Sequence, residues 1–215
     1  MLAAGLPSQT VDELKSEPES TVSMDDLTQR FVEALSWAAT LHQSQRRKAN
    51  ATPYVAHLLA VAALVLEHGG DEDEAIAALL HDAIEDQGGH PTRLQIDERF
   101  GPRVAAIVEG ATETDLQPKP PWRQRKELHL ARLLQADRSV QLIVAADKLH
   151  NVGSLIADYG RLGAGLWAHF RGGKAGTLWY LRAAAAALPL APAELVAQLN
   201  ARITELERLA AESTD

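Results

Sequence analysis

Apolar residues recur along most of the chain at the three- and four-residue spacing of amphipathic helices. The spacing is clearest near the C-terminal end, where one stripe contains Leu195, Leu199, Ile203, Leu206 and Leu209. A convincing period of two, which a half-buried strand would require, does not occur. The pattern therefore predicts an all-α fold. In such a fold, polar side chains that face one another between helices can form a site.

Glycine and proline residues divide the chain into the predicted helices. Gly69 and Gly70 end one helix, Gly88 and Gly89 end the next, and the stretch from Pro118 to Pro121 marks a loop. The expected helices cover residues 31–41, 54–68, 71–86, 91–99, 102–112, 122–136, 139–157, 165–170 and 176–188, and a last helix begins after Pro192. Asp25 or Asp26 would help to cap the first helix.

The same pattern gives a simple domain organisation. Residues 1–23 are polar, acidic and rich in Ser, Thr and Pro, which is typical of a flexible tail. We expect residues 24–190 to form one helical bundle domain. We expect residues 191–215 to form an amphipathic helix packed on that domain, since most amphipathic helices cover their own core. A surface for a partner is the alternative for this helix.

Composition narrows the classes of function. The chain has no cysteine, which excludes disulfides, thiolate zinc sites and cysteine nucleophiles and suits a cytoplasmic location. No apolar run reaches the roughly 18–20 residues of a membrane span, and no signal peptide is evident. The net charge of −8 argues against non-specific binding to nucleic acid or anionic membranes. Two basic clusters, at 46–48 and 119–126, could still attract a small anionic ligand. The oligomeric state, including a homo-oligomer, stays open.

The run His81-Asp82-Ala-Ile-Glu85-Asp86 concentrates an imidazole and three carboxylates in six residues. If the run is helical, these four side chains lie within one sector of roughly 140°. So much like charge on one face is unfavourable unless a cation sits there, and a divalent metal ion is the simplest candidate.

Two further residues could complete a metal site. Asp147 interrupts an apolar stretch in a predicted buried helix, where an unpaired carboxylate costs several kcal/mol. Lys148 is adjacent, but neighbouring helix positions diverge by about 100°. His57 lies in the predicted helix 54–68. Together with His81 and Asp82 these residues make a mixed nitrogen and oxygen set, which suits Mn²⁺, Fe²⁺, Zn²⁺ or Mg²⁺. A coordination position left open would serve hydrolysis.

Other polar residues near this set have expected roles. Glu85 and Asp86 lie one turn beyond the ligands, where one of them could take a proton from an attacking water. Asn151 lies one turn after Asp147 on the same face, where it could bind substrate or orient a ligand. The remaining histidines are expected to be structural or exposed: His42, His68, His90, His129 and His150.

These motifs resemble the HD-domain hydrolases of the RelA/SpoT type, and most of all their stand-alone members, the small alarmone hydrolases. The resemblance covers about residues 27–187 and keeps the order of the motifs. It rests on Arg47-Lys48, Thr52-Pro53-Tyr54, His57, His81-Asp82 with Glu85-Asp86, Arg99-Phe100-Gly101 with Val104, and Ala146-Asp147-Lys148-Leu149-His150-Asn151.

The resemblance implies an HD helical fold and a Mn²⁺-dependent hydrolysis with one ion per chain. The reaction would remove the 3′-pyrophosphate of the alarmones ppGpp and pppGpp, giving GDP or GTP and pyrophosphate. By motif, the ligands of the ion would be His57, His81, Asp82 and Asp147. The same comparison assigns the activation of water to Glu85 and Asp86.

The resemblance also implies contacts to the nucleotide. Arg47, Lys48 and Asn151 would contact the nucleotide or its phosphates. Lys126 belongs to a basic loop that would close over the substrate. Further along, Arg171 or Lys174 could bind phosphate, whereas Trp167 and Phe170 are expected in the core.

The chain departs from the family pattern at one position, and two alternatives to the alarmone hydrolase function stay open. Members of the family usually carry Arg two residues after the Asn, where this chain has Gly153. The substrate could instead be an adenine alarmone of the pppApp type or the 2′-phosphate of NADPH, because the metal site does not select the base. A sensing module without turnover is the other alternative. The intact pair Glu85 and Asp86 argues against it, since a sensor needs no residues that activate water.

Overall fold

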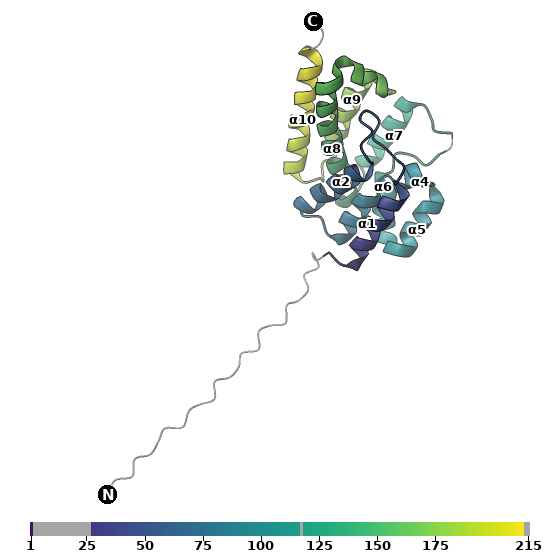
Figure 1. The fold of residues 1–215 in the computed structure, drawn as a ribbon, viewed down its shortest axis with the longest axis vertical. Helices are drawn as coiled ribbons and strands as arrows, with labels where there is room; N and C mark the ends of the chain where they lie inside the picture. Colours follow the sequence, from purple (N-terminus) through teal and green to yellow (C-terminus); the bar gives the residue numbers. More distant parts are fainter. Residues whose placement is uncertain (2–26, 117, 213–215) are drawn as a thin grey trace.

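The computed structural model describes Met1 and residues 27–116 and 118–212, and in this part of the chain the fold is all-α, as predicted (Figure 1). An isolated antiparallel bridge joins Arg46 and Pro53. The elements are α1 (Gln29–Leu41), α2 (Val55–Glu67), α3 (Glu72–Leu80), α4 (Ala83–Gln87), α5 (His90–Phe100), α6 (Pro102–Ala111), α7 (Trp122–Leu133), α8 (Arg138–Leu162), the 3-10 helix η1 (Gly163–His169), α9 (Gly173–Ala186) and α10 (Ala193–Glu212).

The first helix begins with a different cap from the one predicted. The hydroxyl of Thr28 accepts a hydrogen bond from the backbone N–H of Arg30 at 3.2 Å, so Thr28 is the N-cap of α1. Asp25 and Asp26 lie outside the described residues, as does the predicted tail of residues 1–23 apart from Met1.

The predicted helix over residues 71–86 is two helices, so the single-helix interpretation of the acidic run is wrong. α3 ends at Leu80 and α4 begins at Ala83. Between them, Asp82 has φ −99° and ψ 0°, which departs from α-helical geometry. The carbonyl of Ala78 receives a hydrogen bond from the ring of His81, 2.8 Å away. A turn, and not a continuous helix face, therefore presents His81 and Asp82.

The long helix α8 organises the bundle. It packs against α2, α3, α6 and α10, and α10 runs alongside it (Figure 1). On α10, Leu195, Leu199, Ile203 and Leu206 are buried, and burying a leucine contributes about 1.5–3 kcal/mol. No helix among the described residues has the length and apolar character needed to cross a membrane. The centre of α8 is thus held rigidly from several sides, which fixes the position of its polar residues.

Candidate metal centre and substrate cavity

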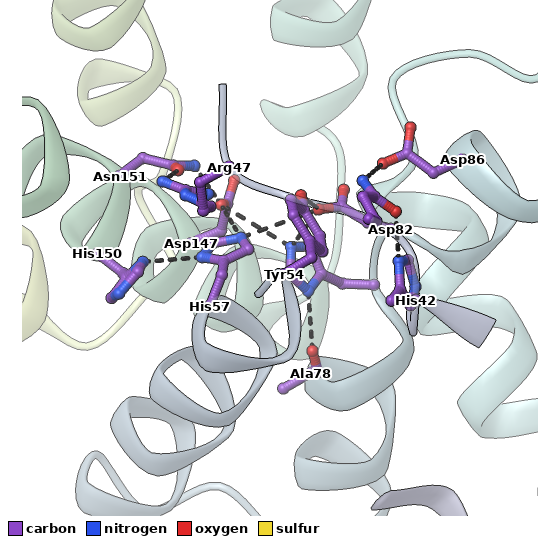
Figure 2. A network of polar contacts seen from close by, with 12 residues as sticks. His42, Arg47, Tyr54, His57, Ala78, Asp82, Asp86, Asp147, His150 and Asn151 are labelled. Carbon is purple, nitrogen blue, oxygen red and sulfur yellow. Dashed lines mark hydrogen bonds and ion pairs between the residues drawn. The ribbon is translucent and has the colours of Figure 1, made fainter. Parts of the chain in front are cut away.

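Four predicted ligands converge from three parts of the fold, and Figure 2 labels three of them, His57, Asp82 and Asp147. His57 comes from α2, His81 and Asp82 come from the turn between α3 and α4, and Asp147 comes from α8. The Nε2 atom of His57 lies 3.2 Å from Asp147 Oδ1 and 3.9 Å from Asp82 Oδ2. The Nε2 atom of His81 lies 3.1 Å from Asp82 Oδ2 and 3.8 Å from Asp147 Oδ1. Two imidazoles and two carboxylates therefore face one small space.

The hydrogen bonds of the two imidazoles suit a metal ion in this space. Nδ1 of His81 faces the carbonyl oxygen of Ala78, which can only accept, so this nitrogen carries the hydrogen. In the neutral ring, Nε2 then keeps its lone pair, as a metal ligand requires. The Nε2 atoms of His57 and His81 are both buried, and apart from their close approach to the carboxylates of Asp147 and Asp82 neither makes a hydrogen bond. A divalent cation would satisfy both atoms, so the donor set fits a metal.

His150 supports His57 from behind, although the sequence placed it among the structural or exposed histidines. The Nδ1 atoms of the two rings are 2.8 Å apart, so one of them donates and the other accepts. Burial and the neighbouring His57 lower the pKa of His150 to about 4, and burial also lowers the pKa of His57. Two neutral rings allow His57 to donate from Nδ1 and to direct the lone pair of Nε2 into the site.

The carboxylates make the site strongly attractive to a cation. Burial lowers the pKa of His81, but the carboxylates of Asp82 and Asp147 outweigh burial and raise this pKa to about 9. Despite its burial, Asp147 keeps a pKa well below the usual range because of the ammonium group of Lys148 and the nearby imidazoles. Positive charge is therefore stabilised between the two carboxylates.

Lys148 corrects one expectation from the sequence. Its Nζ atom forms an ion pair with Asp147 Oδ2 at 2.6 Å, although adjacent helix positions diverge. The four-carbon side chain is long enough to bend back to the neighbouring residue. Oδ2 of Asp147 is therefore paired with Lys148, while Oδ1 faces the space between the candidate metal ligands.

Tyr54 is a member of the site that the sequence reasoning did not assign. Its hydroxyl donates a short hydrogen bond to Asp82 Oδ2. Burial and the charge of Asp82 raise the pKa of Tyr54, so the hydroxyl keeps its proton and remains a donor. The position of Tyr54 directly after Pro53, three residues before His57, was the available signal in the sequence. Tyr54 fixes the orientation of the Asp82 carboxylate.

Glu85 and Asp86 line the same cavity as His81, Asp82 and Asp147. Glu85 pairs with the Nζ atom of Lys119 at 2.8 Å. Asp86 accepts a hydrogen bond from Gln45 Nε2 at 2.7 Å. Each carboxylate is therefore held by a different partner, from the loop before α7 and from the loop after α1.

The cavity above the metal-facing space has a volume of about 740 Å³, a size typical of ligand sites. Arg47 and Lys48 line it, as does Asn151. The guanidinium of Arg47 donates to Asn151 Oδ1 at 2.8 Å, and the amide of Asn151 donates to Asp147 Oδ1. A chain of contacts thus runs from Arg47, in the loop after α1, through Asn151 to Asp147 in the candidate metal centre (Figure 2).

Of the other predicted substrate contacts, Lys126 and Arg171 line the cavity and Lys174 does not. Lys126 lines the cavity, where its Nζ atom pairs with Glu113 and lies 4.1 Å from the ring centroid of Tyr180. Arg171 is exposed and lines the cavity. Lys174 instead donates to the carbonyl of Ala210 on α10, so a phosphate contact by Lys174 is not supported.

Trp167 and Phe170 were both expected in the core, and only Trp167 is buried there. Trp167 is buried in the core, while Phe170 is half-buried and also lines the cavity. His129 is buried in the cavity wall, and burial together with the cations around it lowers its pKa to about 3. His129 is therefore a neutral part of the wall.

Comparison with known proteins agrees with this architecture. Residues 34–178 match the HD domain family, and the chain belongs to that family. Over 128 residues it is 39% identical to the "Guanosine-3′,5′-bis(diphosphate) 3′-pyrophosphohydrolase MESH1" of Xenopus tropicalis, covering 58% of this chain and 69% of the relative.

Two other similarities extend the comparison. The chain is 38% identical over 125 residues to the "GTP pyrophosphokinase rsh" of Brucella melitensis biotype 1, covering 57% of this chain but only 16% of that longer protein. A solved structure described as "A metazoan ortholog of SpoT hydrolyzes ppGpp and plays a role in starvation responses" superposes with a TM-score of 0.71 at 26% identity. This match covers 84% of this chain and 97% of the other. The fold is therefore that of an HD-type small alarmone hydrolase.

Proposed function

We propose that this protein is a metal-dependent (p)ppGpp 3′-pyrophosphohydrolase, which converts ppGpp or pppGpp to GDP or GTP and pyrophosphate. The observation that carries the proposal is the pair of buried Nε2 atoms of His57 and His81, which make no hydrogen bond and face two carboxylates at the wall of a cavity of about 740 Å³. The names of the similar proteins support the same activity.

The proposed cofactor is one Mn²⁺ ion per chain, held by His57, His81, Asp82 and Asp147. Imidazole with carboxylate donors suits Mn²⁺ and its neighbours in the transition series better than Ca²⁺ or Mg²⁺. When bound, such an ion polarises a phosphoryl oxygen and lowers the pKa of a coordinated water. Tyr54 and His150 would keep Asp82 and His57 in orientation for the ion.

The protein's own residues would divide the remaining work. Glu85 or Asp86 would accept one proton of the water that attacks the 3′ phosphorus. As the bond between phosphorus and the 3′ oxygen breaks, that oxygen would take up a proton and leave as the ribose 3′-hydroxyl. The substrate is strongly anionic, and the cations that line the cavity would bind its phosphates. We assign this binding to Arg47, Lys48, Lys126 and Arg171, with Asn151 between the nucleotide and Asp147.

The test is a product analysis with the full chain and Mn²⁺. We expect ppGpp to yield GDP and pyrophosphate in equal amounts, and Glu85→Gln and Asp86→Asn each to reduce the rate while metal binding persists. Release of orthophosphate from NADPH, with ppGpp left intact, would overturn the substrate assignment. Tight ppGpp binding without any product would favour a sensing module. A cytoplasmic location stays a prediction from the sequence.

A further inference from the structure

Asp158 is a buried carboxylate in the substrate cavity that the proposed chemistry does not use. It is 6% exposed, and it lines the same cavity as Asp147 and Asn151. A carboxylate repels phosphate, so this wall position does not suit the pyrophosphate groups. It suits a part of the ligand that presents hydrogen-bond donors.

The geometry of α8 places Asp158 in line with the metal centre. Asp147 and Asp158 are 11 residues apart, so they differ by only about 20° around the helix and by about 16 Å along its axis. Asn151 and Ser154 lie between them on the same face, and both line the cavity. A ligand whose phosphate end lies at Asp147 would therefore extend along α8 toward Asp158.

The contacts of Asp158 leave it able to accept further hydrogen bonds. Oδ1 receives a hydrogen bond from Asn50 Nδ2 at 3.1 Å and pairs with Arg161, while Oδ2 receives a longer contact of 3.4 Å from the same amide. A carboxylate offers about four lone-pair sites. Ala49 and Leu155 also line the cavity and supply apolar surface near this end.

We infer that Asp158 reads the purine base and selects guanine over adenine. Guanine presents two adjacent donors, N1–H and the 2-amino group, which can pair with both oxygens of one carboxylate. Adenine presents a single amino group beside the N1 acceptor, and a carboxylate repels that acceptor. A bidentate pair of this kind discriminates by roughly 10- to 100-fold, which corresponds to about 1.4–2.7 kcal/mol. The inference rests on the proposed function, because it places the phosphate end of the nucleotide at the metal centre.

The test compares wild type, Asp158→Asn and Asn50→Ala in two measurements. The first is kcat/KM with ppGpp and with its adenine analogue ppApp. The second is calorimetric binding of GDP and ADP, which requires no turnover. In wild type we expect guanine to be preferred in both. Asp158→Asn should lower kcat/KM for ppGpp and GDP affinity by roughly 10- to 100-fold, while leaving the adenine ligands unchanged or improved. Asn50→Ala removes the contact with Asp158 and the hydrogen bond from the Thr52 N–H, but it keeps the Asp158 carboxylate, so the preference for guanine should persist.

Two results would overturn the inference. One is a wild type that binds GDP and ADP equally. The other is an Asp158→Asn variant that weakens both bases by the same factor, as expected of a residue that only anchors Asn50 and its loop. If guanine preference is present and is lost in Asp158→Asn, yet ppGpp is not hydrolysed, the inference stands and the proposed function fails.

Discussion

The contact between His57 and His150 makes a sharp prediction, because it supports a proposed metal ligand without belonging to the ligand set. His150→Phe removes the ring nitrogen and keeps a planar side chain of similar shape. His57 is 1% exposed, so its Nδ1 would lose its partner in a place that water does not reach. An unsatisfied buried donor costs about 1–3 kcal/mol, and loss of a partner behind a metal ligand typically costs about 10- to 100-fold in metal affinity.

The assay is calorimetric titration of Mn²⁺ into metal-free protein. We expect the Kd of His150→Phe to rise by about 10- to 100-fold, which corresponds to about 1.4–2.7 kcal/mol. His90→Phe is the matched control, since His90 is exposed at the start of α5 and should leave the Kd unchanged. A His150→Phe variant that is folded, as judged by circular dichroism, and binds Mn²⁺ within twofold of wild type would show that His150 does not support the metal site.

Two further predictions concern packing and substrate binding. A Cβ at Gly110 would lie 2.6 Å from a methyl group of Val140, whereas a Cβ at Gly153 would meet nothing within 4 Å. Gly110→Ala should therefore lower the free energy of unfolding by about 1–3 kcal/mol. Gly153→Ala should raise it by about 0.5–1 kcal/mol. Urea denaturation measures both changes, and equal effects of the two substitutions would contradict this packing. Arg47→Ala should raise the KM for ppGpp about tenfold with a smaller change in kcat, because a phosphate contact is lost. Arg202→Ala, an exposed change on α10, is its control, and an unaltered KM in Arg47→Ala would remove Arg47 from the binding site.

The sequence predicts most of the helices because their apolar periodicity is a local signal. It does not predict the break at His81 and Asp82, since neither residue is a strong helix breaker and the acidic run keeps a helical spacing. The break appears only in the folded chain, where the turn brings both residues toward His57 and Asp147. Thr28 as the cap of α1 is likewise a local choice among several polar residues that can cap a helix.

The candidate metal ligands were recognisable because each is chemically conspicuous in its own segment. Asp147 interrupts an apolar helix, and His81-Asp82 precedes two further acids. The supporting residues are different. Tyr54 contacts Asp82 across 28 positions of sequence, and His150 contacts His57 across 93. Such contacts depend on how helices pack, and neither residue type reveals them from its local pattern.

Metal-dependent hydrolysis of ppGpp is tested most directly by titrating metal-free protein with Mn²⁺ while the release of GDP from ppGpp is followed. We expect no turnover without metal, a rate that rises with bound Mn²⁺ and saturates at one ion per chain, and loss of both binding and turnover in Asp82→Ala. Turnover that persists in metal-free protein, or in Asp82→Ala at the wild-type rate, would contradict this expectation.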